Sequence, residues 1–297
     1  TRKESSAASD VYKRQLFRDA HQSIEIENAL MNAGLQYRTL TMNSYLLREE
    51  ILFLRGMIAI ALDDFHHVAS PTTREAIVEA LATFAEVPLT PEALSEAKST
   101  LAKEPSALKH FFDGQIQRVG SVSARTRIAD AVSFLRGLSV DSPAHTALEK
   151  VCDIMDMENL AKRLYVHPYE ASVVTKSVSG FITTAQNSGK TLSQFSEWIG
   201  AAEAFVGARP GKNAVLMDCI VNVKGKEFDH VVLPFMDAGE FPNPLRDLGE
   251  EENLFYVAAT RTKARLTLVS SEEAARRSVF VERMQLAAIQ KLSLIHI

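Results

Sequence analysis

An arginine near the end of the chain has the chemistry of an anion ligand but no local partner. Residues 250–265, EEENLFYVAATRTKAR, are predicted to form a helix, and at about 100° per residue Arg261 lies about 20° from the apolar Leu254. Val257 and Arg265 lie four residues before and after it, so no helical carboxylate neutralises it. Two interpretations stay open: Arg261 snorkels or pairs with a distant carboxylate, or its planar guanidinium binds a phosphate.

A charged turn is the second candidate. The segment 218–234, DCIVNVKGKEFDHVVLP, places Lys-Gly-Lys-Glu between two apolar runs that are typical of buried strands. Gly225 can adopt a positive φ and lets a partner approach the backbone, Lys224 offers a cation, and Glu227 offers acceptors for hydroxyl groups. Its composition fits an ordinary solvated turn. Its place after a buried strand, at the edge where open α/β sheets bind ligands, favours a ligand contact.

Two other patterns are interpreted as structural. The segment TTAQNSGKT ends like a phosphate-binding loop, but Thr184 stands where the first glycine of that loop belongs. We therefore interpret it as a loop and N-cap before the helix LSQFSEWIGAAEAF. Asp229 and His230 are neighbours in a predicted strand, so their side chains point to opposite faces and do not form an acid/base pair.

The elements that position these residues follow an α/β pattern at both ends of the chain. Residues 16–40 indicate a strand end, a helix closed by Gly34, and an extended piece. After residue 214 the runs AVLMDCIV, HVVLPFM and RLTLVSS are typical of buried parallel strands, with a helix before the last. In between, the pairs Ser70-Pro71, Thr90-Pro91 and Ser142-Pro143 each predict a capped helix with proline at its first position.

The simplest architecture is one α/β domain built from both ends of the chain, with an all-helical domain inserted in its middle. We predict the α/β domain over residues 16–64 and 212–290 and the helical insertion over 65–211, with FVGARPGKN as the linker. Residues 1–15 and 291–297 resemble translated sequencing adapters, so we exclude both tails as non-native.

Composition limits the classes of function. The chain of 297 residues is 46% hydrophobic with a formal net charge of −4, which argues against a generally basic nucleic-acid coat but leaves a local basic groove open. Cys152 and Cys219 are far apart and lack a CxxC partner, so neither a disulfide framework nor a zinc site is indicated. No apolar run reaches the roughly 18 residues of a membrane helix. We expect a soluble, cytoplasmic protein without a membrane partner.

Three ordered segments carry a family resemblance. KGKEFDHVVLP, GEFPNP and EEENLFYVAATRTKARLTL resemble motif V (TxHxxKGxEF), the GxFP phrase and motif VI (EExxLxYVAxTRA) of the UvrD/Rep family of superfamily 1 DNA helicases. The segments LFRDAHQSIEIENALMNAGLQYRTL and SYLLREEILFLRG resemble the region after motif IV. The resemblance spans nearly all of residues 16–290. It implies a RecA-like parallel-sheet motor domain, related to P-loop NTPases but without the P-loop, that carries the helical insertion.

The resemblance also implies roles in ATP hydrolysis. Arg261 is the catalytic motif VI arginine that reaches the γ-phosphate of ATP, while Glu227 contacts the ribose. Gly225 forms part of the turn, and Tyr256 lies near the same cleft. Because this chain lacks the Walker A and B motifs, we expect it to hydrolyse ATP only within a longer protein. The ligands of Mg²⁺ and the first RecA-like domain are then expected outside the chain.

For nucleic acid, the resemblance implies that Lys224 and Asn222 contact single-stranded or junction DNA. Cys219 and Val221 depart from the pattern, because they replace the motif V threonine and histidine and have weaker or no hydrogen-bonding ability. Motif VI also has Glu252 and Asn253 where a basic pair is common, and GEFPNPLRD fits either a DNA-facing loop or a plain connection. The leading hypothesis is an ATP-dependent 3′–5′ DNA helicase or translocase. The alternative is a non-catalytic nucleic-acid-binding or assembly module.

Overall fold

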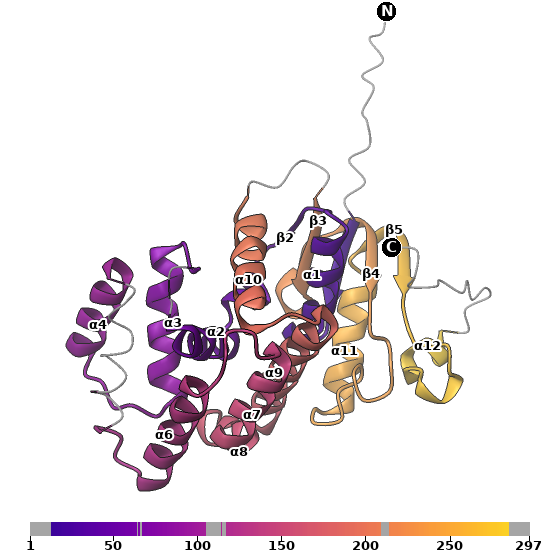
Figure 1. Ribbon diagram of the computed structural model, residues 1–297. Helices are drawn as coiled ribbons and strands as arrows, with labels where there is room; N and C mark the ends of the chain where they lie inside the picture. The colour runs from indigo at the N-terminus through magenta and orange to yellow at the C-terminus, as the bar shows by residue number, and fades with distance from the viewer. Residues whose placement is uncertain are drawn as a thin grey trace, which may run out of the picture. The chain divides into compact units, whose positions relative to one another are not determined.

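The computed structural model describes residues 13–63, 65, 67–104, 114, 117–208 and 214–284 (Figure 1). The chain divides into two compact units, Thr1–Asn43 with Ala208–Ile297 and Ser44–Gly207. This division differs from the predicted boundaries at 64/65 and 211/212. Most of the predicted tails and of the predicted linker lie outside the described residues, except that residues 13–15 begin the first strand.

The first unit contains a five-stranded parallel sheet in the order β2-β3-β1-β4-β5. The strands are β1 (Lys13–Phe17), β2 (Tyr37–Thr39), β3 (Val215–Cys219), β4 (Phe228–Leu233) and β5 (Thr262–Leu268). The N-terminal strand β1 lies between β3 and β4, so the two distant parts of the sequence share one sheet (Figure 1). The predicted α/β fold with a parallel sheet is confirmed.

Helices of the first unit complete this α/β arrangement. They are η1 (Ala20–Gln22), α1 (Ser23–Asn32), η4 (Ile220–Val223), α11 (Leu248–Ala259), η5 (Ala274–Arg276) and α12 (Val279–Arg283). Gly34 adopts a φ of +66° just past α1, as the predicted helix end requires. The core brings together apolar residues of β1, β4, η4, α11, α12 and the connection between β4 and α11: Leu16, Ile220, Val223, Phe228, Val231, Leu233, Met236, Phe241, Ala258 and Phe280.

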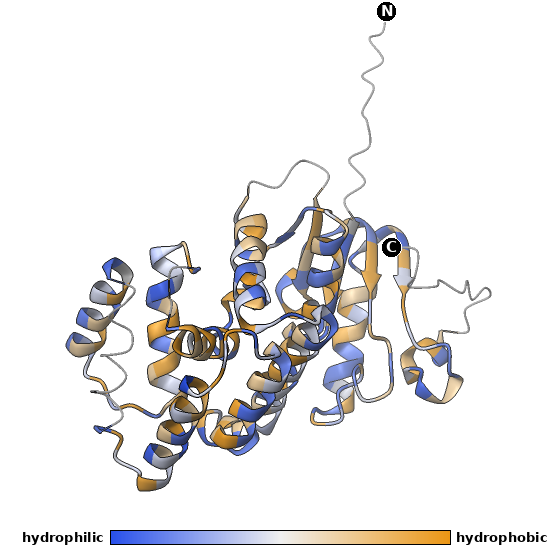
Figure 2. Ribbon diagram, in the orientation of Figure 1, coloured by the Kyte–Doolittle hydropathy of each residue, from blue (hydrophilic) through white to orange (hydrophobic). Residues whose placement is uncertain are grey.

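The second unit is helical. Its helices are η2 (Tyr45–Leu47), α2 (Glu49–Leu62), α3 (Pro71–Phe84), α4 (Pro91–Lys103), α6 (Val122–Arg136), α7 (Ala144–Met155), α8 (Met157–Leu164), α9 (Pro168–Ser188) and α10 (Leu192–Gly207). Eleven of the fourteen residues of α2 are buried, and the helix packs against α3, α6, α9 and α10. Figure 2 shows α2 as strongly hydrophobic. A helix that is apolar on nearly all sides must be enclosed, and the four neighbouring helices of this unit enclose α2.

Two of the three predicted Ser/Thr-Pro caps are confirmed. The hydroxyl groups of Ser70 and Thr90 accept backbone N–H groups at the starts of α3 and α4, with proline at the first helical position. The third prediction was wrong, because α7 begins at Ala144 and Pro143 itself is its N-cap. Here the backbone pairs with a distant segment: Ala144 N donates to Lys190 O at 3.0 Å, and Leu192 N donates to Ser142 O at 2.9 Å.

The segment that resembles a phosphate-binding loop is mostly helical. The prediction of a loop was therefore wrong for residues 183–188, while the predicted N-cap of the following helix is confirmed. Helix α9 continues to Ser188, and Gly189 ends it with a φ of +61°. Thr191 then caps α10, since its hydroxyl accepts from Gln194 N while the Gln194 side chain accepts from Thr191 N.

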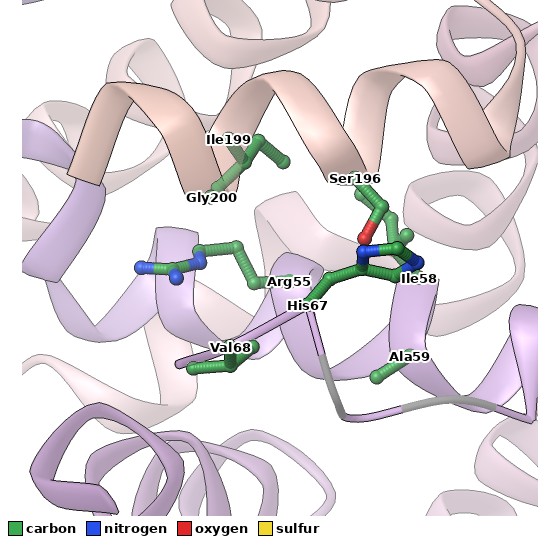
Figure 3. A pocket seen from close by; sticks show the side chains of 8 residues that line it. All are labelled: Arg55, Ile58, Ala59, His67, Val68, Ser196, Ile199 and Gly200. Carbon is green, nitrogen blue, oxygen red and sulfur yellow. The ribbon is translucent and has the colours of Figure 1, made fainter. Parts of the chain in front are cut away.

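A shallow hollow beside α10 is lined by Arg55, His67, Ser196 and Gly200, among others (Figure 3). Burial lowers the pKa of Arg55, and the neighbouring Glu203 carboxylate opposes that shift. Arg55 also donates to the carbonyl of Leu46 at 2.7 Å. These contacts tie α2 to α10 within the helical unit.

Replacing Gly200 with alanine is expected to lower the free energy of unfolding by about 1–2 kcal/mol, although alanine is the better helix former by about 1 kcal/mol. A Cβ at this position would lie 2.9 Å from the carbonyl oxygen of His67, and a backbone atom cannot move aside cheaply. Urea unfolding measures the change. Gly207→Ala in the same helix is the control, because no atom of the other described residues, apart from its chain neighbours, lies within 4 Å of its Cβ position. A Gly200→Ala midpoint at or above the wild-type value would contradict the prediction.

Candidate nucleotide and DNA site

The connection between β3 and β4 carries the predicted turn across the sheet. Strand β3 ends at Cys219 and β4 begins at Phe228, and both run parallel to β1. Leu16 pairs with Asp218 on one side, while Gln15 pairs with Val232 on the other, so Phe228 lies about five residue levels from Asp218. The Lys-Gly-Lys-Glu turn therefore lies at the amino end of β4. The prediction that it lies at the carboxyl edge was wrong, because the connection must return to the start of the next parallel strand.

The helix η4 fixes which residues of this connection face outward. In a 3₁₀-helix, side chains three residues apart lie on the same side. Ile220 and Val223 are fully buried in the core that also contains Ala258 of α11. Val221 and Asn222 between them are exposed. Asn222, predicted to contact DNA, therefore presents its side chain at the surface.

The turn itself requires glycine. Lys226 N donates to Val223 O at 3.0 Å, Lys224 has φ −55° and ψ 127°, and Gly225 has a φ of +81°. These values define a type II β-turn, whose third position favours glycine. Apart from the adjoining residues, no atom of the described part of the chain lies within 4 Å of a Cβ built at Gly225. The backbone is therefore open to a ligand at this point, and Lys224 and Glu227 are exposed on either side.

Arg261 lies in a tight turn, not on a helix. Helix α11 ends at Ala259 and β5 begins at Thr262, so the predicted helix over 250–265 was wrong after Ala259. The helix stops because β5 pairs with β4: Phe228 N donates to Arg261 O at 2.8 Å, and Phe228 is level with Thr262. The apolar stripe of the helix therefore ends before Arg261.

The guanidinium of Arg261 brings the two candidate segments together. Its Nη1 donates to the carbonyl oxygen of Lys226 at 3.2 Å, its Nε to the carbonyl oxygen of Val257 at 3.0 Å, and its Nη2 to the hydroxyl of Thr260 at 3.1 Å. All three acceptors are neutral. Among the described residues, no carboxylate lies within ion-pair distance of Arg261. The guanidinium therefore lies next to the open turn without an ion-pair partner in the described part of the chain.

The other predicted nucleotide ligands are at the surface. Glu227 lies 3.7 Å from Lys263 Nζ, with both side chains more than half exposed, so this ion pair holds the carboxylate only weakly. Tyr256 lies on α11 with 69% of its surface exposed. His230 bonds to Thr267 across β4 and β5 at 2.9 Å, which agrees with its predicted structural role.

The far end of the connection holds a polar cluster. Asp218 is buried at the carboxyl end of β3, and its Oδ1 accepts from Thr41 Oγ1 at 2.6 Å and from Asn222 Nδ2 at 3.1 Å. The sequence analysis missed Asp218 and Thr41. The available signal was a carboxylate inside the apolar run AVLMDCIV.

Comparison with known families gives one result that bears on both units. The family model of the UvrD-like helicase C-terminal domain matches residues 124–273, which include the β3–β4 connection, α11 and Arg261. The chain belongs to this family. A comparison with curated proteins found no match.

Within this UvrD-like domain, a second buried network joins three segments that are distant in sequence. Arg18 follows β1 and donates from Nε to Glu251 Oε2 at 2.8 Å and from Nη1 to Asp19 Oδ1 at 2.8 Å. Asn243, in the GEFPNP loop, donates from its backbone N to Glu251 Oε2 at 2.9 Å and from Nδ2 to Asp19 Oδ2 at 3.2 Å. This network fixes the loop and the start of α11 against the sheet.

The residues present fit part of a nucleotide. The UvrD-like domain offers the Arg261 guanidinium for phosphoryl oxygens, an open glycine turn and an exposed carboxylate for hydroxyl groups. No group of three or more His, Cys, Asp or Glu side chains that could hold a metal ion is found in the described part of the chain. No helix within the described ranges is long and apolar enough to cross a membrane.

Proposed function

We propose that this UvrD-like domain is the C-terminal part of an ATP-dependent 3′–5′ DNA helicase or translocase. The observation that supports this best is the hydrogen bond from Arg261 Nη1 to the carbonyl of Lys226, 35 residues away in the sequence. In this proposal, the contact brings the motif VI arginine next to the motif V turn.

In this proposal, each surface residue has a distinct role toward ATP. Arg261 places its permanent charge and planar fork on the oxygens of the transferred phosphoryl group, where charge develops in the transition state. Glu227 accepts hydrogen bonds from ribose hydroxyls, and Gly225 lets the nucleotide approach the backbone. Tyr256 contributes its exposed ring near the same cleft. Mg²⁺ and the attacking water are held by the first RecA-like domain of the protein.

Toward DNA, we assign two residues on the η4 side of Gly225 in the same connection. Asn222 and Lys224 are exposed and offer an amide and an ammonium group, both of which donate to phosphate oxygens. The partner in this proposal is single-stranded or junction DNA. Cys152 and Cys219 form no disulfide within the described part of the chain, which is compatible with a reducing cytoplasm as the place of action.

The proposal is tested with a protein that joins this chain to its first motor domain. We expect ATP turnover that single-stranded DNA stimulates, and unwinding of a duplex with a 3′ tail but not of one with a 5′ tail. Turnover without DNA dependence, or unwinding from the 5′ tail, would contradict the proposal.

One observation favours a second candidate, the non-catalytic binding or assembly module. Val221 is 61% exposed and cannot hydrogen-bond, and the Cys219 thiol is buried with its Sγ 3.8 Å from the sulfur of Met42. Neither residue can replace the motif V threonine and histidine. Stable binding of single-stranded DNA with no ATP turnover would support this candidate instead.

A further inference from the structure

Asp218 is a buried carboxylate whose two oxygen atoms differ sharply in their surroundings. The side chain lies at the carboxyl end of β3 with 1% of its surface exposed. Its Oδ1 accepts three hydrogen bonds, from Thr41 Oγ1 at 2.6 Å, Cys219 N at 2.8 Å and Asn222 Nδ2 at 3.1 Å. Its Oδ2 is buried and has no hydrogen-bond partner in the described part of the chain.

Such an arrangement is costly for a strand residue. A buried carboxylate oxygen without a partner loses its hydration and gains nothing in return. The neighbours Met217 and Cys219 are apolar or weakly polar and buried, so an apolar side chain at position 218 would fit the strand better. Each unsatisfied buried group calls for an explanation. For Asp218, the explanation is that Oδ1 orients the side chains of Thr41 and Asn222.

Both side chains that Asp218 holds reach the surface. Asn222 is exposed on η4, and its bond to Asp218 fixes the rotation of its amide plane. One N–H group of this amide is thereby used, while the other N–H and the carbonyl are left for a partner. Thr41, also exposed, follows β2, the strand next to β3 in the sheet. Two adjacent strands thus present two oriented polar groups at the same edge.

We infer that Asp218 is a positioning residue that orients Asn222 toward the backbone of single-stranded DNA, so that motif V of this chain contacts DNA through Asn222. This inference rests on the proposed function. A DNA contact through Asn222, the next outward-facing position of η4, would replace the contacts that the family makes through the threonine and histidine at positions 219 and 221. This accounts for the presence of Cys219 and Val221 there. The exposed Lys224 and Lys226 supply positive charge for the phosphates beside the buried carboxylate.

The test is a double-mutant cycle in the protein that joins this chain to its first motor domain. Affinity for a fluorescent oligo(dT) is measured for Asp218→Leu, Asn222→Ala and the double variant. We expect each single change to weaken binding about tenfold, as loss of a hydrogen bond to a charged group does. We expect the double variant to bind no more weakly than Asn222→Ala, because Asp218 acts through Asn222.

Glu27→Gln is the matched control. Glu27 is also a buried carboxylate of this unit, and it accepts from Ser23 Oγ at 2.6 Å and Tyr37 OH at 2.9 Å. Its replacement should leave DNA affinity unchanged even where it lowers the thermal unfolding midpoint. If Asp218→Leu does not fold, Asp218→Ala replaces it in the same cycle, with the same lack of additivity expected.

Two outcomes would overturn the inference. Unchanged affinity in the Asp218 variant would show that the carboxylate is structural, and full additivity with Asn222→Ala would show that the two residues act separately. Either result leaves the proposed function standing if the unaltered protein binds single-stranded DNA and turns over ATP. Absence of both activities in the unaltered protein would instead reject the proposed function.

Discussion

Replacing Arg261 with alanine is expected to lower ATP turnover by about 10³- to 10⁵-fold in the protein that joins this chain to its first motor domain. The expected size follows from the role of an arginine that stabilises charge developing on the transferred phosphoryl group. The guanidinium bonds to two carbonyl oxygens and one hydroxyl, all at the edge of the fold. Its loss should therefore cost only about 1 kcal/mol of stability. Single-stranded DNA binding should stay measurable.

Two further variants make this result specific. Arg261→Lys keeps the charge but loses the planar fork, so we expect turnover close to that of the alanine variant. Arg265→Ala removes an exposed arginine of β5 four residues away and should leave turnover within about twofold, as expected for a surface change away from the site. Steady-state ATPase assays measure the turnover of all three variants. Turnover of Arg261→Ala near the wild-type rate would remove Arg261 from the catalytic machinery.

Replacing Glu251 with alanine should lower the free energy of unfolding by about 3–5 kcal/mol, the usual cost of leaving one member of a buried ion pair alone. The Arg18 and Glu251 side chains are 5% and 1% exposed. Without Glu251, Arg18 keeps only the Asp19 carboxylate as a charged partner among the contacts described above, and Asn243 N loses its acceptor. Several buried polar groups are thus affected by one change.

Urea unfolding measures this loss, with Glu250→Ala as the control. Glu250 is the preceding residue of the same helix, and its ion pair with Arg246 at 2.9 Å is exposed. Removal of such a surface pair costs about 0.3–0.5 kcal/mol. Equal midpoints for the Glu251 and Glu250 variants would contradict the conclusion that the buried network fixes the start of α11 against the sheet. A large loss for Glu251 alone would support it.

Local patterns in the sequence predicted most of the elements. Short apolar runs indicated β3, β4 and β5, and the Ser70 and Thr90 caps indicated two helix starts, because these signals act within a few residues. The resemblance in motif order also brought Arg261 and the turn into one hypothesis. Where a distant segment competes with a local signal, the prediction failed, as at Pro143 and after Ala259.

The polar clusters could not have been predicted from spacing. Arg18 and Glu251 are 233 residues apart, and Thr41 and Asp218 are 177 apart, so no helical or strand periodicity relates them. Only the order of strands in the sheet brings their positions together. The membership of α2 in the helical unit has a similar cause, since a hydrophobic pattern shows that a helix is enclosed but not which neighbours enclose it.

The connection between β3 and β4 has eight residues, 220–227, and these must cover about 17 Å from one end of the strands to the other. A connection of eight residues can follow few other paths over this distance. Ile220 and Val223 fasten it to the core, so inserting a single residue would rotate Asn222 inward or lift the turn away from Arg261. The length of this connection thus fixes the spacing between Asn222, where DNA is proposed to bind, and the turn beside Arg261, where ATP is proposed to bind. That spacing is determined by the length of the strands.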